Sequence, residues 1–451
     1  MSEPCDLSAV EARRLIGAKK LSPVELMSSC LARIEATNKA VNAVVAMIDE
    51  RAARKAAKAA EQAVMRGEDL GLLHGLPIGV KDLQDTAGLR TTYGSLLYKD
   101  HVPKDDNTTI ARIRSEGGII LCKTNTPEFG AGSNTTNRVY GPTGNPFDPK
   151  LTCAGSSGGS AVALALGQVP LATGSDYGGS LRTLAPFPVS GPMGRTLEDA
   201  PLLLAAQIDV DKGDPFSSGD SLSIPTRLQG VDLANVRAAF SVDLGCAPID
   251  DGIKGIYRER MKSVRGCFAE AVNAAPEFSN VHETFEILRG VVFVSAHRER
   301  LEKHRDLLGR NVIDNTERGL KYSLGDVAWA NVEQSKIYKG FLRFFDDVDV
   351  LICPAASVSP FPHEQLFVEA INGEAMPTYM RWLAITYAPT MALATSAVIP
   401  CGVDHKGLPF GIQVMGPNGS DAMVLEVAHA LERVLATDSA TRRPVPDLTK
   451  L

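Results

Sequence analysis

The residues of this sequence best suited to chemistry are two serine–glycine clusters and one lysine. The clusters are "CAGSSGGSAVALALG" at 153–167 and "SDYGGSLRTLAPF" at 175–187, and the lysine is Lys81 in "GLPIGVKDLQDTAG" at 75–88. A serine hydroxyl attacks a carbonyl only when a base removes its proton. A lysine among apolar residues faces desolvation, which favours the neutral amine that such a base requires. Together the three segments predict serine-dependent acyl chemistry.

Several simpler explanations exist for each segment taken alone. The "GSSGG" motif matches the G-x-S-x-G nucleophile elbow with Ser157 as nucleophile, but the two prolines of "NPFDPKLTCA" before it favour a loop over the strand that an elbow needs. No serine stands three residues before a lysine, and no glycine run contains a G-K-S/T phosphate motif. The glycines alone could form tight turns. Lys81 alone would usually pair with a carboxylate such as Asp82 or Asp85.

The segments in combination resemble the amidase signature family, whose catalytic triad is Ser, cis-Ser and Lys. The matching motifs are, in order, "GLPIGVKD", "KTNTPEFGAGSNT", "YGPTGNP", "GSSGGSA", "GSDYGGSLR", "SGPMGRTLEDA", "AVIPCG" and "LPFGIQVMGP". They span most of the chain in the family's order and spacing, and the helical middle is the least diagnostic part. The resemblance implies an α/β fold in a single large domain, with a central mixed β-sheet flanked by helices.

The resemblance also implies a role for each triad residue. Ser180 corresponds to the nucleophile that forms the acyl-enzyme, and Lys81 to the terminal base. Ser156 corresponds to the bridging serine, with a cis peptide bond expected between Gly155 and Ser156. In this arrangement Ser156 accepts the proton of Ser180 while it passes its own proton to neutral Lys81. Activity is therefore expected to rise from neutral to alkaline pH, as Lys81 loses its proton.

The glycines before Ser180 fit the need to stabilise a negatively charged tetrahedral intermediate. Backbone N–H groups can supply that stabilisation, and glycine lets the chain turn them towards the substrate. In the family these donors come from the nucleophile and the residues just before it, which here are Tyr177, Gly178, Gly179 and Ser180.

Four further residues are expected to support the site. Asp176 and Arg182 would brace the nucleophile turn by an ion pair. Ser157 and Ser160 would hydrogen-bond Lys81 or the loop, or cap the helix that "AVALALG" predicts.

The sequence indicates the substrate less clearly than it indicates the reaction type. The aromatic-rich segment "PTYMRWLAITYAPT" at 377–390 lies where the family lines its pocket. Phe129, Tyr177, Tyr379 and Trp382 could form an apolar wall, although each taken alone is better explained as a core residue. We therefore predict an amidase for small-molecule aryl or hydrophobic amides, with esters or carbamates as secondary substrates. The alternatives are the glutamine-hydrolysing subunit of a tRNA-dependent amidotransferase and a catalytically inactive relative that acts as a binding protein.

One departure from the family motivates the inactive alternative. After Thr183 the chain continues directly with Leu184 in "LAPFPVSGPMGRT", whereas the family first passes through a further strand and loop. A true deletion would leave apolar and backbone groups beside Ser180 without partners. The other explanation is that residues are missing at this point from the sequence as it was read.

The helices and strands around these residues are predicted from the spacing of apolar residues and from the positions of glycine and proline. Residues 1–70 read as helices, and 71–204 as a signature core of short apolar strands alternating with helices. Residues 205–345 read as a mostly helical insertion, and 346–451 as strands and a helix that complete the core. Strands on both sides of a helical middle favour one sheet built from distant parts of the chain.

Composition sets limits on the class of protein. The 451 residues are 44% hydrophobic and 22% charged, with a net charge of −6 that gives no reason to expect nucleic acid. The 8 cysteines form no CxxC pair, and no apolar run approaches the roughly 20 residues of a membrane span. Neither a metal-binding spacing nor a signal peptide is visible. These features predict a cytoplasmic enzyme, a monomer or homodimer, without metal or organic cofactor and without a membrane partner.

Overall fold

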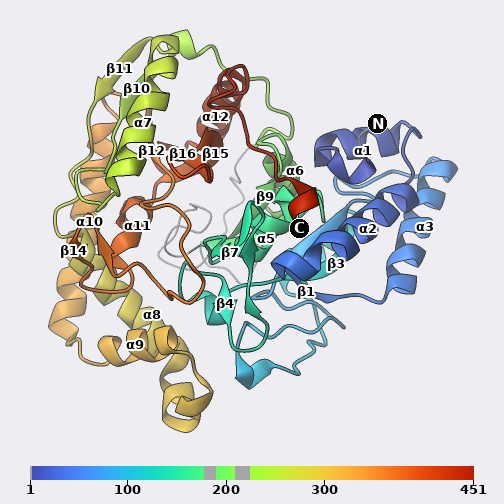
Figure 1. The fold of residues 1–451 in the computed structure, drawn as a ribbon, viewed down its shortest axis with the longest axis horizontal. Coiled ribbons are helices and arrows are strands. Elements are labelled where there is room, and N and C mark those ends of the chain that lie inside the picture. Colours follow the sequence, from blue (N-terminus) through green and yellow to red (C-terminus); the bar gives the residue numbers. More distant parts are fainter. Residues whose placement is uncertain (1–2, 177–188, 209–223) are drawn as a thin grey trace. The chain divides into compact units, whose positions relative to one another are not determined.

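The computed structural model describes residues 3–176, 189–208 and 224–451, and its chain forms two compact units (Figure 1). The first unit comprises Met1–Ser175, Ser190–Leu228 and Val445–Leu451, and the second comprises Asp176–Val189 and Gln229–Pro444. Each unit contains its own five-stranded sheet.

The sheet of the first unit carries the residues of interest. Its strand order is β1 (Val44–Met47), β3 (Ile119–Thr124), β2 (Pro77–Lys81), β8 (Leu171–Asp176) and β9 (Val189–Gly194). Strands β2, β3 and β8 run parallel, and β1 pairs with β3 in the antiparallel sense. Every residue of β2 and β3 is buried, as expected for parallel strands with both faces covered.

Helices cover this sheet. They are α1 (Ala9–Gly17), α2 (Pro23–Val41), α3 (Glu50–Arg66), α4 (Thr108–Ser115), α5 (Gly158–Ala165) and α6 (Asp199–Gln207). Of these, α2 and α5 contact β2, while α3, α4 and α5 contact β3. Helix α2 begins as the sequence predicts: Ser22 is the N-cap, Pro23 follows, and Glu25 completes a capping box. Helix α3 ends at Gly67 with a positive φ of 73°, which glycine adopts without strain.

Two short hairpins lead from β3 to α5. The first pairs β4 (Thr136–Asn137) with β5 (Gly141–Pro142), and the second pairs β6 (Gly144–Asn145) with β7 (Asp148–Thr152). The strand β7 contains one of the two prolines that the sequence analysis assigned to a loop, so this stretch is a short hairpin and not a continuous core strand.

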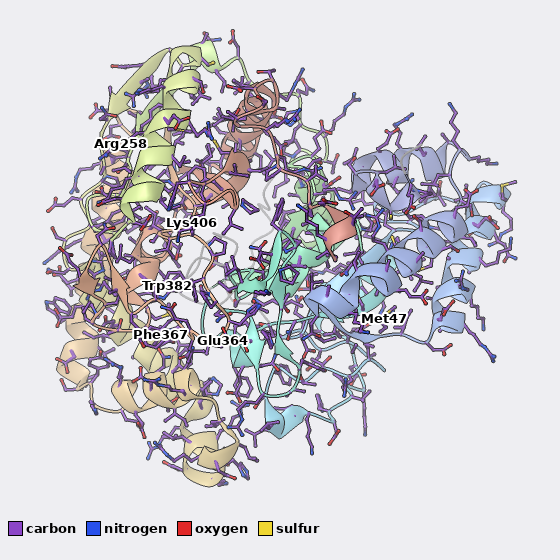
Figure 2. All side chains as sticks on the ribbon, in the orientation of Figure 1. Met47, Arg258, Glu364, Phe367, Trp382 and Lys406 are labelled. Atoms are coloured by element: carbon purple, nitrogen blue, oxygen red, sulfur yellow. The ribbon has the colours of Figure 1, made fainter. Side chains whose placement is uncertain are left out.

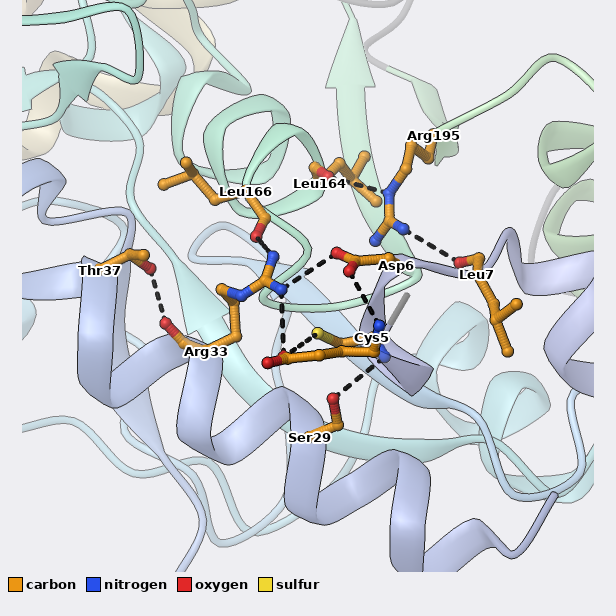
Figure 3. A network of polar contacts seen from close by, with 10 residues as sticks. Cys5, Asp6, Leu7, Ser29, Arg33, Thr37, Leu164, Leu166 and Arg195 are labelled. Atoms are coloured by element: carbon orange, nitrogen blue, oxygen red, sulfur yellow. Dashed lines mark hydrogen bonds and ion pairs between the residues drawn. The ribbon is translucent and has the colours of Figure 1, made fainter. Parts of the chain in front are cut away.

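Two arginines fix the C-terminal end of α5 (Figure 3). Arg33 on α2 donates to the carbonyl of Leu166 at 2.8 Å, and Arg195 donates to the carbonyl of Leu164 at 3.3 Å. Arg33 also forms ion pairs with Glu3 and Asp6, which tie the start of the chain to α2. Cations stabilise the free carbonyls at the end of a helix. These contacts fasten α5, whose other end carries the serine cluster.

The second unit contains a mixed sheet and a group of long helices. The strand order is β11 (Glu270–Asn273), β10 (Arg237–Phe240), β12 (Val350–Pro354), β16 (Pro409–Gly416) and β15 (Thr395–Val403). Strand β10 runs parallel to β11 and β12, while β16 is antiparallel to both β12 and β15. A two-stranded ribbon pairs β13 (Ala370–Ile371) with β14 (Glu374–Ala375). The helices are α7 (Asp251–Val264), α8 (Val281–His304), α9 (Arg310–Gly319), α10 (Leu324–Phe344), α11 (Ala384–Met391) and α12 (Asp421–Ala436).

The architecture confirms the predicted α/β fold of mixed sheet flanked by helices. Among the described residues the strands form two five-stranded sheets, where the sequence alone favoured one. Two strands of the region expected to be mostly helical, β10 and β11, were missed. Their sequences, "RAAF" and "EAVN", are four residues long and contain a single β-branched residue, so periodicity gave little signal for a strand.

Candidate active site

Lys81 ends strand β2 with its side chain fully buried. Its Nζ lies 2.7 Å from Oγ of Ser156, 2.9 Å from Oγ of Ser157 and 2.9 Å from Oγ of Ser175. It also lies 3.5 Å from the carbonyl oxygen of Ser175. The amine therefore sits among hydroxyl groups. Among the bonds described for Nζ, none goes to Asp82 or Asp85, the carboxylates considered from sequence.

Ser156 and Ser157 reach Lys81 from the turn that leads into α5. The peptide bond between Gly155 and Ser156 is cis, as the family resemblance predicts. Thr135 donates to the carbonyl of Ala154 at 2.7 Å, and Ser133 donates to the carbonyl of Gly155 at 3.2 Å. The turn is thus held from the preceding hairpin region.

Ser157 and Ser160 take different parts in this arrangement. Ser157 occupies the N-cap position of α5 but makes no side-chain capping bond; its hydroxyl contacts Lys81 instead. Ser160 lies 2.7 Å from Oγ1 of Thr124 on β3 and donates to the carbonyl of Thr173 on β8 at 2.8 Å. Ser160 therefore joins α5 to two strands and does not touch the amine within its described bonds.

Small residues keep space open around Ser156. A Cβ on Gly130 would lie 3.8 Å from Oγ of Ser156 and 3.2 Å from the side chain of Leu83. A Cβ on Gly159 would lie 2.3 Å from the backbone nitrogen of Asn125, so α5 approaches β3 as closely as glycine allows. This close approach brings the serines within reach of Lys81.

The comparison with known families shows which protein family has this arrangement. The family model described as Amidase matches residues 25–187 and 185–425, which is most of the chain. The chain belongs to the amidase signature family. Members of this family are hydrolases that act on C–N bonds. The two matched stretches overlap at 185–187, within a few residues of the junction between Thr183 and Leu184.

Relatives of two kinds lie at similar distance from this amidase. An acylamidase of Rhodococcus erythropolis is 29% identical and covers 95% of both chains. A glutamyl-tRNA(Gln) amidotransferase subunit of Salinispora arenicola is 30% identical, covering 96% of this chain and 98% of its own. Sequence similarity alone does not separate the two.

Solved structures agree with the fold. A crystal structure of an amidase has a TM-score of 0.83 and 26% identity, covering 95% of this chain and 99% of its own. A bacterial aryl acylamidase of the amidase signature family has a TM-score of 0.86 and 24% identity, covering 95% and 96% of the two chains.

Several predicted site residues lie outside the described part of the amidase. These are the predicted nucleophile, the other oxyanion-hole residues and the bracing arginine: Ser180, Tyr177, Gly178, Gly179 and Arg182. The junction between Thr183 and Leu184 lies outside it as well. Asp176, the last residue of β8, is described and is buried.

The predicted pocket residues fall in different units. Phe129 belongs to the first unit, where it is half-buried and stacks on Tyr93 at 6.3 Å between ring centroids. Tyr379 and Trp382 are buried in the second unit, and Figure 2 labels Trp382 there. Trp382 donates its ring N–H to the carbonyl of Tyr379 at 2.9 Å, and Phe361 packs edge-on against it.

Tyr379 also borders a small cavity of the second unit. Its hydroxyl accepts a hydrogen bond from Arg289 at 3.1 Å and contacts the side-chain amide of Asn315. The cavity is lined by these residues together with Phe285, Glu286, Gly290, Asp314, Arg318, Tyr322, Thr378 and Met380.

The described residues offer neither a metal cluster nor a membrane-spanning helix. Across residues 3–176, 189–208 and 224–451, no group of three or more His, Cys, Asp or Glu side chains is placed to hold a metal ion. In the same part of the chain no helix has the length and apolar character needed to cross a membrane.

Sequence reasoning missed the polar residues that surround Lys81. Thr173 accepts a hydrogen bond from the backbone N–H of Lys81 at 3.0 Å, and its own hydroxyl donates to the side chain of Gln84. Ser175 was part of the quoted cluster, but its contact with the amine was not expected. A second buried lysine, Lys123, is the penultimate residue of the neighbouring strand β3. The sequence signal for it was "LCKT", which repeats the pattern of an apolar strand that ends in lysine.

Proposed function

We propose that this protein is an amidase that cleaves aryl or hydrophobic carboxamides through an acyl-enzyme on Ser180, with Ser156 and Lys81 relaying the proton. Esters and carbamates are secondary substrates. The observation that carries the proposal is the 2.7 Å contact between Nζ of Lys81 and Oγ of Ser156 in a fully buried setting. Support for acyl amides comes from the acylamidase relative.

The proposed reaction has two halves. In the first, Oγ of Ser180 attacks the amide carbon, its proton passes to Ser156, and Ser156 gives its own proton to neutral Lys81. The C–N bond then breaks, and the leaving amine takes a proton back along the same path. In the second half, water attacks the ester carbon and releases the carboxylic acid and free Ser180. Backbone N–H groups of Tyr177 to Ser180 would stabilise the oxyanion in both halves.

A second candidate is the glutamine-hydrolysing subunit of a tRNA-dependent amidotransferase. It is favoured by relatives of that name at 29% and 30% identity over nearly the whole chain. Such a subunit works with partner chains, whereas the amidase proposed here would act without them. An inactive relative that serves as a binding protein is the third possibility, because of the junction at Thr183.

Turnover by the isolated chain separates the three. We expect purified protein to release 4-nitroaniline from 4-nitroacetanilide without any partner. An amidotransferase subunit would leave the anilide intact and release ammonia from glutamine only with partner chains, and an inactive relative would do neither.

Variants test the residue roles. Ser180→Ala and Lys81→Ala should each lower kcat at least about a thousandfold, because the acyl-enzyme cannot form or the serines lack a base. Ser157→Ala serves as the comparison, since its hydroxyl contacts Lys81 but takes no part in the proposed relay. Activity near that of the wild type in Ser180→Ala or Lys81→Ala would contradict the triad.

A further inference from the structure

A second buried lysine lies beside Lys81 on the opposite face of the same pair of strands. In the parallel register of β2 and β3, Val80 pairs with Lys123 and Lys81 pairs with Thr124. Neighbouring residues of a strand point to opposite faces. Lys81 and Thr124 therefore share the face that meets α5, and Lys123 points to the other face.

Lys123 contacts the turn that follows Lys81. Its Nζ donates to the carbonyl oxygen of Gln84 and to Oγ1 of Thr86, the latter at 3.1 Å. The backbone N–H groups of Leu83 and Gln84 both donate to the carbonyl of Lys81, at 2.7 and 3.2 Å. The ammonium group thus closes a tight turn whose first residue is Lys81.

Gln84 connects this turn to the backbone of Lys81 by a second path. Its side-chain oxygen accepts from Oγ1 of Thr173, and that hydroxyl in turn accepts from the N–H of Lys81 at 3.0 Å. Its side-chain nitrogen donates to Ser190 on β9 at 3.1 Å. Lys123 therefore binds the main-chain carbonyl of Gln84, and the side chain of Gln84 binds Thr173, which in turn binds the backbone N–H of Lys81.

Burying the amine of Lys123 costs desolvation free energy. Lys123 is fully buried, and desolvation lowers its pKa to about 8, against the opposing effect of the carboxylates of Asp82, Asp85 and Asp106. Burial likewise raises the pKa of Asp82. Part of this cost is offset, because the charge of Lys123 acts to lower the pKa of the buried Asp82 and the two groups are electrostatically coupled. Lys123 therefore has two kinds of contact on this face of the sheet: an electrostatic one with Asp82 and its hydrogen bonds to the turn at Gln84 and Thr86.

We propose that Lys123 is a positioning residue for Lys81: it fixes the turn of Gln84 and Thr86 and thereby the strand end from which Lys81 reaches Ser156. This role rests on the proposed function of Lys81 as the base. Lys123 itself touches neither Ser156 nor Ser157 within its described bonds. It acts through Gln84 and Thr173, because these fix the backbone N–H of Lys81.

The test compares Lys123→Met with Cys122→Ala, a matched change at the adjacent buried position of the same strand. We expect Lys123→Met to lower kcat for 4-nitroacetanilide about 10- to 100-fold with KM unchanged within about twofold, because small displacements of a reacting group cost rate and not binding. Cys122→Ala should lose thermal stability without loss of kcat. A change confined to KM, or equal losses of kcat in both variants, would overturn the proposal.

A double variant shows whether Lys123 acts through Lys81. In the Lys81→Ala background, measured with the activated ester 4-nitrophenyl acetate, adding Lys123→Met should lower the residual rate no further. An additional loss as large as that in the wild-type background would refute the positioning role. Should Lys123→Met fail to fold, Thr173→Val, which removes the bond to the N–H of Lys81, must show the same two results. If Lys81→Ala turned over the anilide at the wild-type rate, both the proposed function and the positioning role would be refuted. That result differs from one in which only the effect of Lys123→Met is absent, which would refute the positioning role alone.

Discussion

Replacing Gly159 by alanine should disturb the candidate site, because the added methyl group would collide with backbone atoms. The added Cβ would lie 2.3 Å from the backbone nitrogen of Asn125, 2.7 Å from its carbonyl oxygen and 2.8 Å from the carbonyl oxygen of Ala43. All three are backbone atoms, so no side chain can rotate away. Ordinary contact begins near 3.4 Å, so α5 would have to retreat from β3 by about 1 Å.

Helix α5 cannot retreat freely, because it is held at both ends. Arg33 and Arg195 bind the carbonyls at its C-terminal end, and Lys81 binds the serines at the other. A retreat of about 1 Å would take the 2.7 Å contact between Lys81 and Ser156 beyond hydrogen-bonding range. We therefore expect Gly159→Ala to lower the free energy of unfolding by about 1–3 kcal/mol and kcat by about a hundredfold.

Gly255→Ala provides the matched control. Gly255 is exposed within helix α7, and a Cβ there would meet no atom within 4 Å. Alanine favours a helix interior over glycine by about 0.5–1 kcal/mol, so this variant should be slightly more stable with unchanged kcat. Denaturant unfolding and anilide turnover of both variants test the reasoning. A Gly159→Ala protein with the melting temperature and kcat of the wild type would refute it.

Two further predictions concern the second unit. Tyr379→Phe removes the hydroxyl that Arg289 and Asn315 share, and should lower stability by about 1–3 kcal/mol; an unchanged unfolding midpoint would contradict the described network. Burial lowers the pKa of His282 and of His297 to about 4, whereas an unfolded histidine titrates near pH 6.5. The unfolded chain therefore binds these protons first, and stability should fall as the pH drops from about 6.5 to about 4. After discounting for solvent screening, the loss is about 1–2 kcal/mol per histidine. His297→Leu should show a shallower decline.

Local signals predicted much of the first unit. Ser22 before Pro23 and the glycine at 67 marked helix ends because capping depends on a few adjacent residues. The resemblance also placed Lys81 and Ser156 together, although 75 residues separate them in the chain. That inference came from the family's motifs and could not have come from spacing alone.

The residues that hold Lys81 in place could not be found in this way. Thr173 and Gln84 are ordinary polar residues in sequence, and their roles arise only when β2, β8 and the turn after Lys81 meet. Lys123 lies near the end of an apolar strand much as Lys81 does, yet the register pairs it with Val80 and so places it on the opposite face. The face of the sheet on which a side chain lies depends on register, and register is a property of the paired strands and not of one strand's composition.

The junction at Thr183 leads to the last prediction. The family match breaks at 185–187, where the sequence passes directly to "LAPFPVSGPMGRT". The masses of the intact protein and of the peptide that spans Thr183 and Leu184 come first, because 48.1 kDa corresponds to the sequence as it stands and a larger mass for that peptide would mean that residues were missed there. If the mass is 48.1 kDa, inserting between Thr183 and Leu184 the strand and loop that the family resemblance leads us to expect should raise anilide turnover at least about tenfold, because a deletion beside a nucleophile would leave backbone groups without partners. An insertion of equal length made of Gly and Ser is the control. Equal turnover by both insertions and the parent chain would show that the short junction does not limit catalysis.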